Sequence, residues 1–169
     1  MHSTHKQKQG EKNMKNITLL ILSGLLIASC SACNKMMGFN EFGGEQTHEY
    51  DYLFTQFNAD VRTLGHQNLD FSKTKVLLTD EILKKYNADG FCPGLKKSNN
   101  DETTLYVSSR FRTLTKTQQK YVMYHEIGHC FYGLPHKKGG LMTEAMGTLS
   151  MQENDLLFYL KGMLEESNQ

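Results

Sequence analysis

The sequence has no long low-complexity tract, no excess of basic charge and no apolar run of the roughly 20 residues that a membrane-spanning helix needs. Its 169 residues are 38% hydrophobic, which is typical of one globular domain, and the 19 basic and 18 acidic side chains give a net charge of +1. Residues 1–29 hold four lysines and one glutamate, so the rest carries 15 basic and 17 acidic residues. Nothing in this balance indicates a nucleic-acid partner.

The apolar run of residues 17–28 has the length of a signal-peptide core and is preceded by Lys12 and Lys15. It ends in the tetrapeptide Ile27-Ala28-Ser29-Cys30, which resembles a bacterial lipobox. That resemblance implies that residues 1–30 are a signal peptide ending in a lipobox and that Cys30 is lipidated and becomes the first mature residue. The alternative is ordinary signal cleavage without a lipid, because small residues before the cut suit both enzymes.

A lipid on Cys30 would anchor the mature chain to a bacterial membrane, in the cell envelope, facing the periplasm or the surface. Residues 31–46 are small, polar and glycine-bearing, and we expect them to form a flexible tether. Residues 47–169 would then form the folded domain, which we expect to be a monomer.

Three histidines and a glutamate stand out within residues 121–136, YVMYHEIGHCFYGLPH. His125 and His129 are four residues apart, so on a helix they lie on one face and can bind a single ion at Zn–N distances of about 2.0–2.1 Å. Glu126 can place its carboxylate beside that ion without binding it. This is the HExxH arrangement of two ligands and a general base.

A catalytic zinc site needs a third protein ligand and an open position for water. Gly133 can adopt the left-handed conformation that ends a helix in a sharp turn, and Pro135 prevents the helix from resuming. His136 follows at once and is placed to return toward the ion. The pattern therefore predicts a three-histidine site for one catalytic Zn²⁺.

The run HEIGHCFYGLPH resembles the extended zinc-binding signature of the metzincin metallopeptidases, HExxHxxGxxH, in which all three histidines bind zinc and the glutamate activates water. The chain departs from it in having three residues, not two, between His129 and Gly133. The helix must then run one residue further or end differently. Written as HExGHCxxGxxH, cysteine included, the run resembles that of small secreted bacterial metzincin-like lipoproteins.

Metzincins also carry a methionine in a tight turn beneath the zinc. Gly140-Leu141-Met142 resembles that turn, which makes Met142 the candidate and Met146 its competitor. The plain alternative for either residue is a flexible side chain that fills a gap in the core.

Export changes how the cysteines are interpreted, because disulfides persist outside the cytoplasm. With Cys30 lipidated, we expect a disulfide between Cys92 and Cys130, which would connect a turn-rich loop to the zinc helix and leave Cys33 unpaired in the tether. The alternative role of Cys130 as a fourth metal ligand is disfavoured. It follows His125 by five residues, about 500° around the helix, and so lies on another face.

Apolar periodicity predicts a helix over residues 50–64, with an aromatic inner face and an end at Gly65. Strands are expected at residues 75–79 and 103–111. The metzincin resemblance makes the second of these the candidate for an edge strand that pairs with extended substrate, because an exposed edge offers unpaired backbone groups to a peptide. The alternative is an ordinary strand, since the sequence does not place the edge.

Two pairs of residues have capping-box spacing. Thr115 and Gln118 should begin the zinc helix, and Ser150 and Glu153 should begin a last helix that runs through Leu164. The fold class expected from this order is α+β. By resemblance it would be a compact metzincin-like zincin, with a small mixed sheet packed on the N-terminal helix and the zinc helix and a C-terminal helix after the methionine turn.

The resemblance implies an exported zinc-dependent endopeptidase that acts on a peptide or protein substrate, with Glu126 as general base for a metal-activated water. Two alternatives stay open. One is a different zinc hydrolase whose third ligand is distant and in which His136 is incidental. The other is a catalytically silent lipoprotein that binds zinc or a protein partner.

Overall fold

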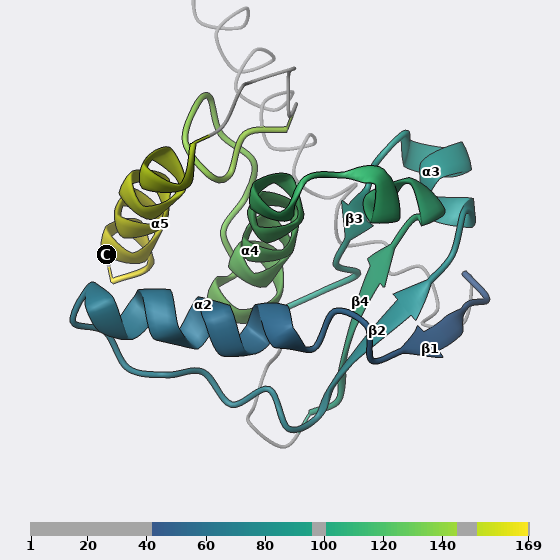
Figure 1. Ribbon diagram of the computed structural model, residues 1–169, viewed down its shortest axis with the longest axis horizontal. Helices are drawn as coiled ribbons and strands as arrows, with labels where there is room; N and C mark the ends of the chain where they lie inside the picture. Colours follow the sequence, from purple (N-terminus) through teal and green to yellow (C-terminus); the bar gives the residue numbers. More distant parts are fainter. Residues whose placement is uncertain (1–41, 96–100, 145–151, 169) are drawn as a thin grey trace, which may run out of the picture. The chain divides into compact units, whose positions relative to one another are not determined.

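The structure is a computed structural model in which residues 42–95, 101–144 and 152–168 are described. The predicted signal peptide, Cys30 and most of the predicted tether lie outside these residues. Figure 1 shows the elements, which in chain order are β1 (Glu45–Thr47), α2 (Tyr52–Thr63), β2 (Thr74–Leu78), α3 (Glu81–Tyr86), β3 (Gly90–Phe91), β4 (Thr103–Val107), the 3-10 helix η1 (Ser109–Thr113), α4 (Lys116–Tyr132) and α5 (Glu153–Ser167).

Four strands form one mixed sheet in the order β1-β2-β4-β3. The central strands β2 and β4 are parallel, whereas β1 and β3 are antiparallel to their neighbours. The α+β class with a small mixed sheet is therefore confirmed. The candidate edge strand of residues 103–111 is a strand only over Thr103–Val107, and it is an inner strand of the sheet, because β2 pairs with one side of it and β3 pairs with Tyr106 and Val107 on the other.

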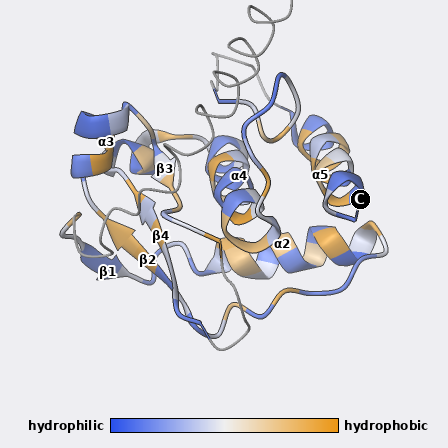
Figure 2. Cartoon of the chain, turned by 180° about the vertical axis from the view of Figure 1, so that it is seen from behind, coloured by the Kyte–Doolittle hydropathy of each residue, from blue (hydrophilic) through white to orange (hydrophobic). Residues whose placement is uncertain are grey.

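The main core lies between one face of this sheet and the helices α2, α4 and α5 (Figure 1). Side chains alternate along β4, as the two-residue period of a strand requires: Leu105 and Val107 face the main core, and Tyr106 joins a smaller cluster with Phe42 and Ile82. Figure 2 shows the corresponding hydrophobic stretches on α2, α4 and β2. α4 is thus packed between the sheet and two other helices.

The predicted N-terminal helix is confirmed as α2. Its buried residues have the expected helical spacing and are Leu53, Phe54, Phe57 and Val61. The Phe57 ring packs edge-on against Tyr124 of α4, with centroids 4.9 Å apart. The helix ends before Gly65, whose φ of 83° is left-handed. The contact between Phe57 and Tyr124 holds α2 against the middle of α4.

The start of the folded domain and the start of α5 also differ from the prediction. Phe42 is buried and β1 begins at Glu45, so ordered structure starts before the predicted end of the tether at residue 46. The capping box of α5 is made by Gln152 and Asp155, two residues later than the predicted pair. None of the described helices has the length and apolar composition needed to cross a membrane.

Candidate metal centre

The helix α4 supplies two of the three histidines, and its ends are set by local sequence. The predicted capping box is present: the Gln118 backbone N–H donates to Thr115 Oγ1 at 3.3 Å, and the Thr115 N–H donates to Gln118 Oε1 at 2.9 Å. The helix ends at Tyr132, and Gly133 follows with a φ of 67°. All three residues between His129 and Gly133 therefore belong to the helix.

The nitrogen atoms of His125, His129 and His136 converge. Nε2 of His125 lies 3.0 Å from Nε2 of His129 and 3.2 Å from Nε2 of His136. Ligands at about 2.0–2.1 Å from a tetrahedral ion are separated by roughly 3.3 Å, close to these distances. The cluster can therefore hold a metal ion.

Two backbone carbonyls determine which nitrogen faces the centre of the cluster. Nδ1 of His125 lies 2.7 Å from the Leu141 carbonyl oxygen, and Nδ1 of His129 lies 2.6 Å from that of Leu134. A carbonyl only accepts, so each Nδ1 must carry the proton and donate it. Each Nε2 then keeps its lone pair, which is the form that binds a metal.

The glycine turn after α4 has two effects on the site. Its left-handed residue, Gly133, lets the chain reverse, and the Leu134 N–H donates back to the Gly128 carbonyl at 3.1 Å. The turn returns His136 to the cluster. The carbonyl of the next residue in the turn, Leu134, accepts from His129. One local bend therefore supplies the third imidazole and orients the second.

The segment before α5 is fixed by three consecutive carbonyl groups. Tyr121 Oη donates to the Gly140 carbonyl at 2.8 Å, His125 Nδ1 donates to that of Leu141, and the Lys137 N–H donates to that of Met142 at 3.0 Å. Because the second of these carbonyls fixes the His125 ring, the segment forms part of the metal centre.

Met142 itself is fully buried beneath α4. A Cβ added to Gly128 would come within 2.4 Å of Met142 Sδ, so the glycine between His125 and His129 gives the methionine its space. The competitor Met146 lies outside the described residues.

Burial favours the neutral form of His125 and His129. The pKa of His125 is lowered to about 4, chiefly by burial; the Leu141 carbonyl opposes this shift and the two neighbouring imidazoles add to it. The pKa of His129 is also lowered, chiefly by burial. Both imidazoles are therefore neutral at neutral pH, as metal ligands must be.

Glu126 is 7% exposed, and burial raises its pKa to about 8, while a hydrogen bond from the Cys92 backbone N–H acts in the opposite direction. The carboxyl lies against β3. A Cβ built on Gly90 would approach Glu126 Cγ to 2.9 Å and Val122 Cγ1 to 2.6 Å. Only glycine lets the strand come this close to α4.

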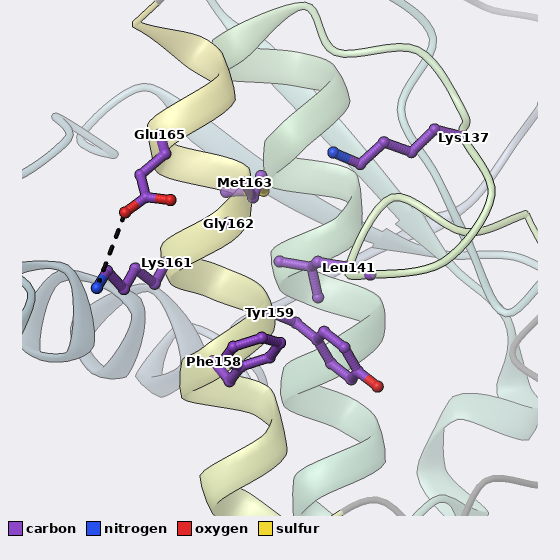
Figure 3. A pocket seen from close by; sticks show the side chains of 9 residues that line it. Lys137, Leu141, Phe158, Tyr159, Lys161, Gly162, Met163 and Glu165 are labelled. Carbon is purple, nitrogen blue, oxygen red and sulfur yellow. Dashed lines mark ion pairs between the residues drawn. The ribbon is translucent and has the colours of Figure 1, made fainter.

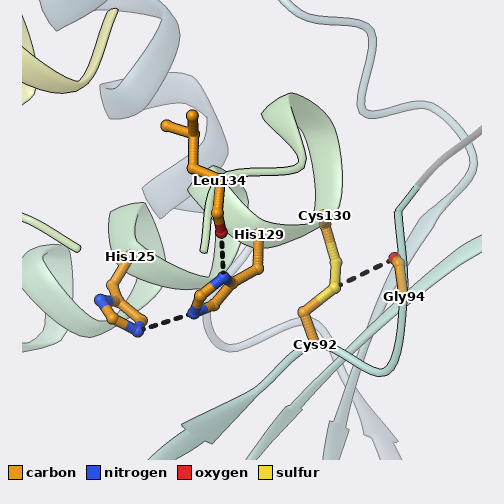
Figure 4. The surroundings of a disulfide bond; sticks show 6 residues. All are labelled: Cys92, Gly94, His125, His129, Cys130 and Leu134. Carbon is orange, nitrogen blue, oxygen red and sulfur yellow. Dashed lines mark hydrogen bonds between the residues drawn. A yellow bond between two sulfur atoms is a disulfide. The ribbon is translucent and has the colours of Figure 1, made fainter. Parts of the chain in front are cut away.

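The disulfide predicted between Cys92 and Cys130 is present and links the loop after β3 to the last turn of α4 (Figure 4). Its presence also removes Cys130 as a metal ligand, because the sulfur is bonded to Cys92. Cys130 directly follows His129 in the sequence, so the bridge is part of the surroundings of the cluster (Figure 4).

No protein-family model, curated protein or solved structure matches this chain. The fold described above is α+β, and the candidate site rests on the geometry of the three histidines. The likeness to the metzincin signature therefore remains a likeness of residues and spacing.

A pocket of about 330 Å³ lies next to this site, between α5 and residues 137–141 (Figure 3). Leu141 and Met163 form part of its apolar wall, and Phe158, which is 73% exposed, stands at its rim. The pocket is not lined by the three histidines or Glu126. Leu141, whose carbonyl accepts from His125, lines both the pocket and the metal centre.

Sequence reasoning missed four contributors to the site. These are the carbonyls of Leu134 and Leu141, which orient two imidazoles, and the glycines Gly90 and Gly128, which admit β3 and Met142. Gly128 could have been recognised from the sequence, because a glycine in the middle of a helix costs about 1 kcal/mol and usually has a packing reason. The two carbonyls could not, since every residue has one.

Proposed function

We propose that this chain is a zinc-dependent endopeptidase of the metzincin type. The observation that carries the proposal is the convergence of three Nε2 atoms, two from α4 and one from the turn after it, with a buried glutamate directly after the first histidine. The position of His136 in the cluster disfavours the alternative in which that residue is incidental.

Three imidazoles suit zinc in both donor type and geometry. Bound there, Zn²⁺ would supply a Lewis acid that polarises a carbonyl and lowers the pKa of water. Glu126, which directly follows His125, is the one buried carboxyl in the described chain. Burial raises the pKa of Glu126 to about 8 in the metal-free chain, and the positive charge of a bound Zn²⁺ would favour the ionised form. The carboxylate would then take a proton from water and pass it to a leaving amine.

The substrate would be an extended peptide segment. β3 is the last strand of the sheet on the side next to α4, and no described strand pairs with its outer edge. An extended peptide can add to such an edge through main-chain hydrogen bonds. The substrate-pairing edge that the metzincin resemblance implied is thus assigned to β3 and not to residues 103–111.

Export and anchoring belong to the proposal through the lipobox-like run that ends at Cys30. Growth of the expressing bacterium with a fatty-acid analogue should label the wild-type chain and leave the Cys30→Ser variant unlabelled. Equal labelling of both chains would contradict lipidation at this residue.

The test of the peptidase function compares three proteins in a casein digest: the wild type, Glu126→Gln and Glu165→Gln. The control residue is an exposed carboxylate on α5. Wild type and control should both cleave and should both stop when a chelator removes zinc. Glu126→Gln should bind one zinc and not cleave, because a proton acceptor is lost and no ligand is.

Two results would contradict this proposal. Cleavage by Glu126→Gln at the wild-type rate would remove the residue from the mechanism. Zinc binding by a wild-type protein that cleaves no member of a peptide library would favour the catalytically silent alternative.

A further inference from the structure

Residues 90–95, called the strap here, run along one side of α4. Gly90 abuts Val122 and Glu126, Cys92 is bonded to Cys130, and Leu95 lies over Gly133. The strap therefore touches α4 from its middle to its C-terminal end.

The four α4 positions that the strap meets, 122, 126, 130 and 133, are spaced by three or four residues and so form one stripe on the helix. They extend over about 16 Å of helix at about 1.5 Å per residue, a length that six extended residues can match at about 3.3 Å each. The stripe is adjacent to the one that carries His125 and His129, because neighbouring residues are about 100° apart. The strap thus borders the metal centre along its length.

The Glu126 carboxyl lies between α4 and the strap. A Cβ on Gly90 would lie 3.0 Å from Glu126 Oε1, so the missing side chain lets the strap backbone come this close, and the Cys92 backbone N–H lowers the pKa of the carboxyl, as a nearby donor does. A carboxyl held by a backbone donor on one side and packed against a strand keeps a single orientation. The strap is therefore the element that fixes where the carboxyl oxygens lie.

Little else holds the second half of the strap. β3 consists of Gly90 and Phe91, which pair with Val107 and Tyr106, and the described residues beyond them belong to no strand. Cys92 is the next residue, and its Sγ is bonded to Cys130 and lies 3.2 Å from the Gly94 carbonyl oxygen (Figure 4). The disulfide is thus the strongest link between the strap and α4.

We propose that the Cys92–Cys130 disulfide is a positioning device for Glu126: it holds the strap on α4 so that the Cys92 N–H stays bound to the carboxyl. Cys92 and Cys130 are then positioning residues and not catalytic ones. The catalytic consequence rests on the proposed peptidase function, whereas the hydrogen bond and its dependence on the disulfide do not.

The first arm of the test needs no activity. Amide hydrogen exchange at Cys92 is measured by NMR in the wild type, Glu126→Gln and Glu126→Ala, all with the disulfide intact. The glutamine keeps a side-chain oxygen as acceptor, so the amide should stay protected, whereas in the alanine variant its exchange should accelerate at least about 10-fold. Equal protection in all three proteins would overturn the proposal, because the carboxyl would not be the acceptor.

The second arm removes the disulfide with the double variant Cys92→Ser/Cys130→Ser. Zinc content should remain at one per chain because no ligand is touched, and kcat should fall about 10- to 100-fold with KM nearly unchanged, since a displacement on the order of 1 Å can cost that much in rate. Exchange at residue 92 should accelerate as in Glu126→Ala. Unchanged kcat together with unchanged exchange would overturn the proposal.

A third arm covers the case in which the double variant does not fold. The folded wild type is treated with a phosphine, which reduces the disulfide to two thiols while water supplies the oxygen of the phosphine oxide and the two protons. The same fall in kcat should appear, with the circular dichroism spectrum unchanged. Loss of the fold in both the variant and the reduced protein would overturn the proposal, because the disulfide would then serve general stability.

The outcomes distinguish the positioning role of the disulfide from the proposed peptidase function. A wild type without peptidase activity would end the peptidase assignment and leave the exchange arm able to decide the positioning role. An active wild type whose Cys92 amide is equally protected in every variant would end the positioning role and leave the peptidase assignment intact.

Discussion

Replacing Glu126 with glutamine should stabilise the metal-free protein, and the gain should grow with pH. Burial raises the pKa of Glu126 from its ordinary value of 4.5 to about 8. The native state therefore binds a proton that the unfolded state has already lost between these two values. The protonated carboxyl favours the native state fully below pH 4.5, and this contribution is lost as the pH rises through about 8.

The magnitude follows from the same pKa values. Each pH unit between them changes the free energy of unfolding by about 1.4 kcal/mol, so the whole penalty above pH 8 is on the order of 5 kcal/mol. Between about pH 5.5 and about pH 8.5 the expected change is roughly 3 kcal/mol. Glutamine has the shape of the protonated acid and cannot ionise, so its variant should lack this penalty. A change of this size is large compared with a typical stability of about 5–15 kcal/mol.

The assay is urea unfolding of chelator-treated wild type, Glu126→Gln and Glu165→Gln at the two pH values, with the disulfide intact. The stability difference between Glu126→Gln and wild type should increase by roughly 3 kcal/mol from the lower to the higher pH. The exposed control should show no such increase, because its carboxylate is already solvated. The same difference at both pH values would refute the reasoning, since the carboxyl would then titrate alike in the folded and unfolded chain.

Three further changes test the packing and hydrogen bonds around the cluster. Gly128→Ala should lower the free energy of unfolding by about 1–3 kcal/mol, because its Cβ would meet Met142 Sδ at 2.4 Å. The control Gly162→Ala, whose Cβ would meet nothing within 4 Å, should raise the free energy of unfolding by up to about 1 kcal/mol. Urea unfolding of the two variants checks both values. Gly133→Ala should cost about 1–2 kcal/mol because the φ of 67° is left-handed, and should weaken zinc binding measured by calorimetric titration. Tyr121→Phe should cost about 1 kcal/mol in urea by removing the donor to the Gly140 carbonyl, and an unchanged midpoint would show that water replaces it.

The site could be predicted where its geometry is local. His125, His129 and His136 lie within twelve residues, and both the helical period and the glycine turn act at that range. The three rings therefore meet whatever surrounds them. The disulfide was also predictable: with Cys30 expected to carry a lipid, three cysteines remained, and the expected place of Cys33 in the tether left Cys92 and Cys130 to pair.

The sheet was less predictable because its decisive strand is very short. β3 has two residues, too few to show the alternation that marks a strand, and it follows the turn-rich run after α3. Without it, β4 was expected at the edge. The position of β3 next to α4 depends on Gly90, whose missing Cβ matters only once Val122 and Glu126 are packed against it.

The orientation of the rings was likewise beyond the sequence. The acceptors for His125 and His129 are the main-chain carbonyls of Leu141 and Leu134, and any residue type can supply such a carbonyl. The prediction of where α5 begins was wrong for a different reason. Ser150 with Glu153 and Gln152 with Asp155 have the same spacing, and only the folded chain distinguishes them.

Zinc affinity of the His136→Ala variant tests the central claim most directly. The wild type, this variant and His48→Ala, whose ring is exposed and remote from the cluster, are titrated with zinc against a competing chelator. Wild type and control should bind one zinc with equal affinity, and loss of the third imidazole should weaken binding at least about 100-fold. Wild-type affinity in His136→Ala would contradict a three-histidine centre built by the glycine turn.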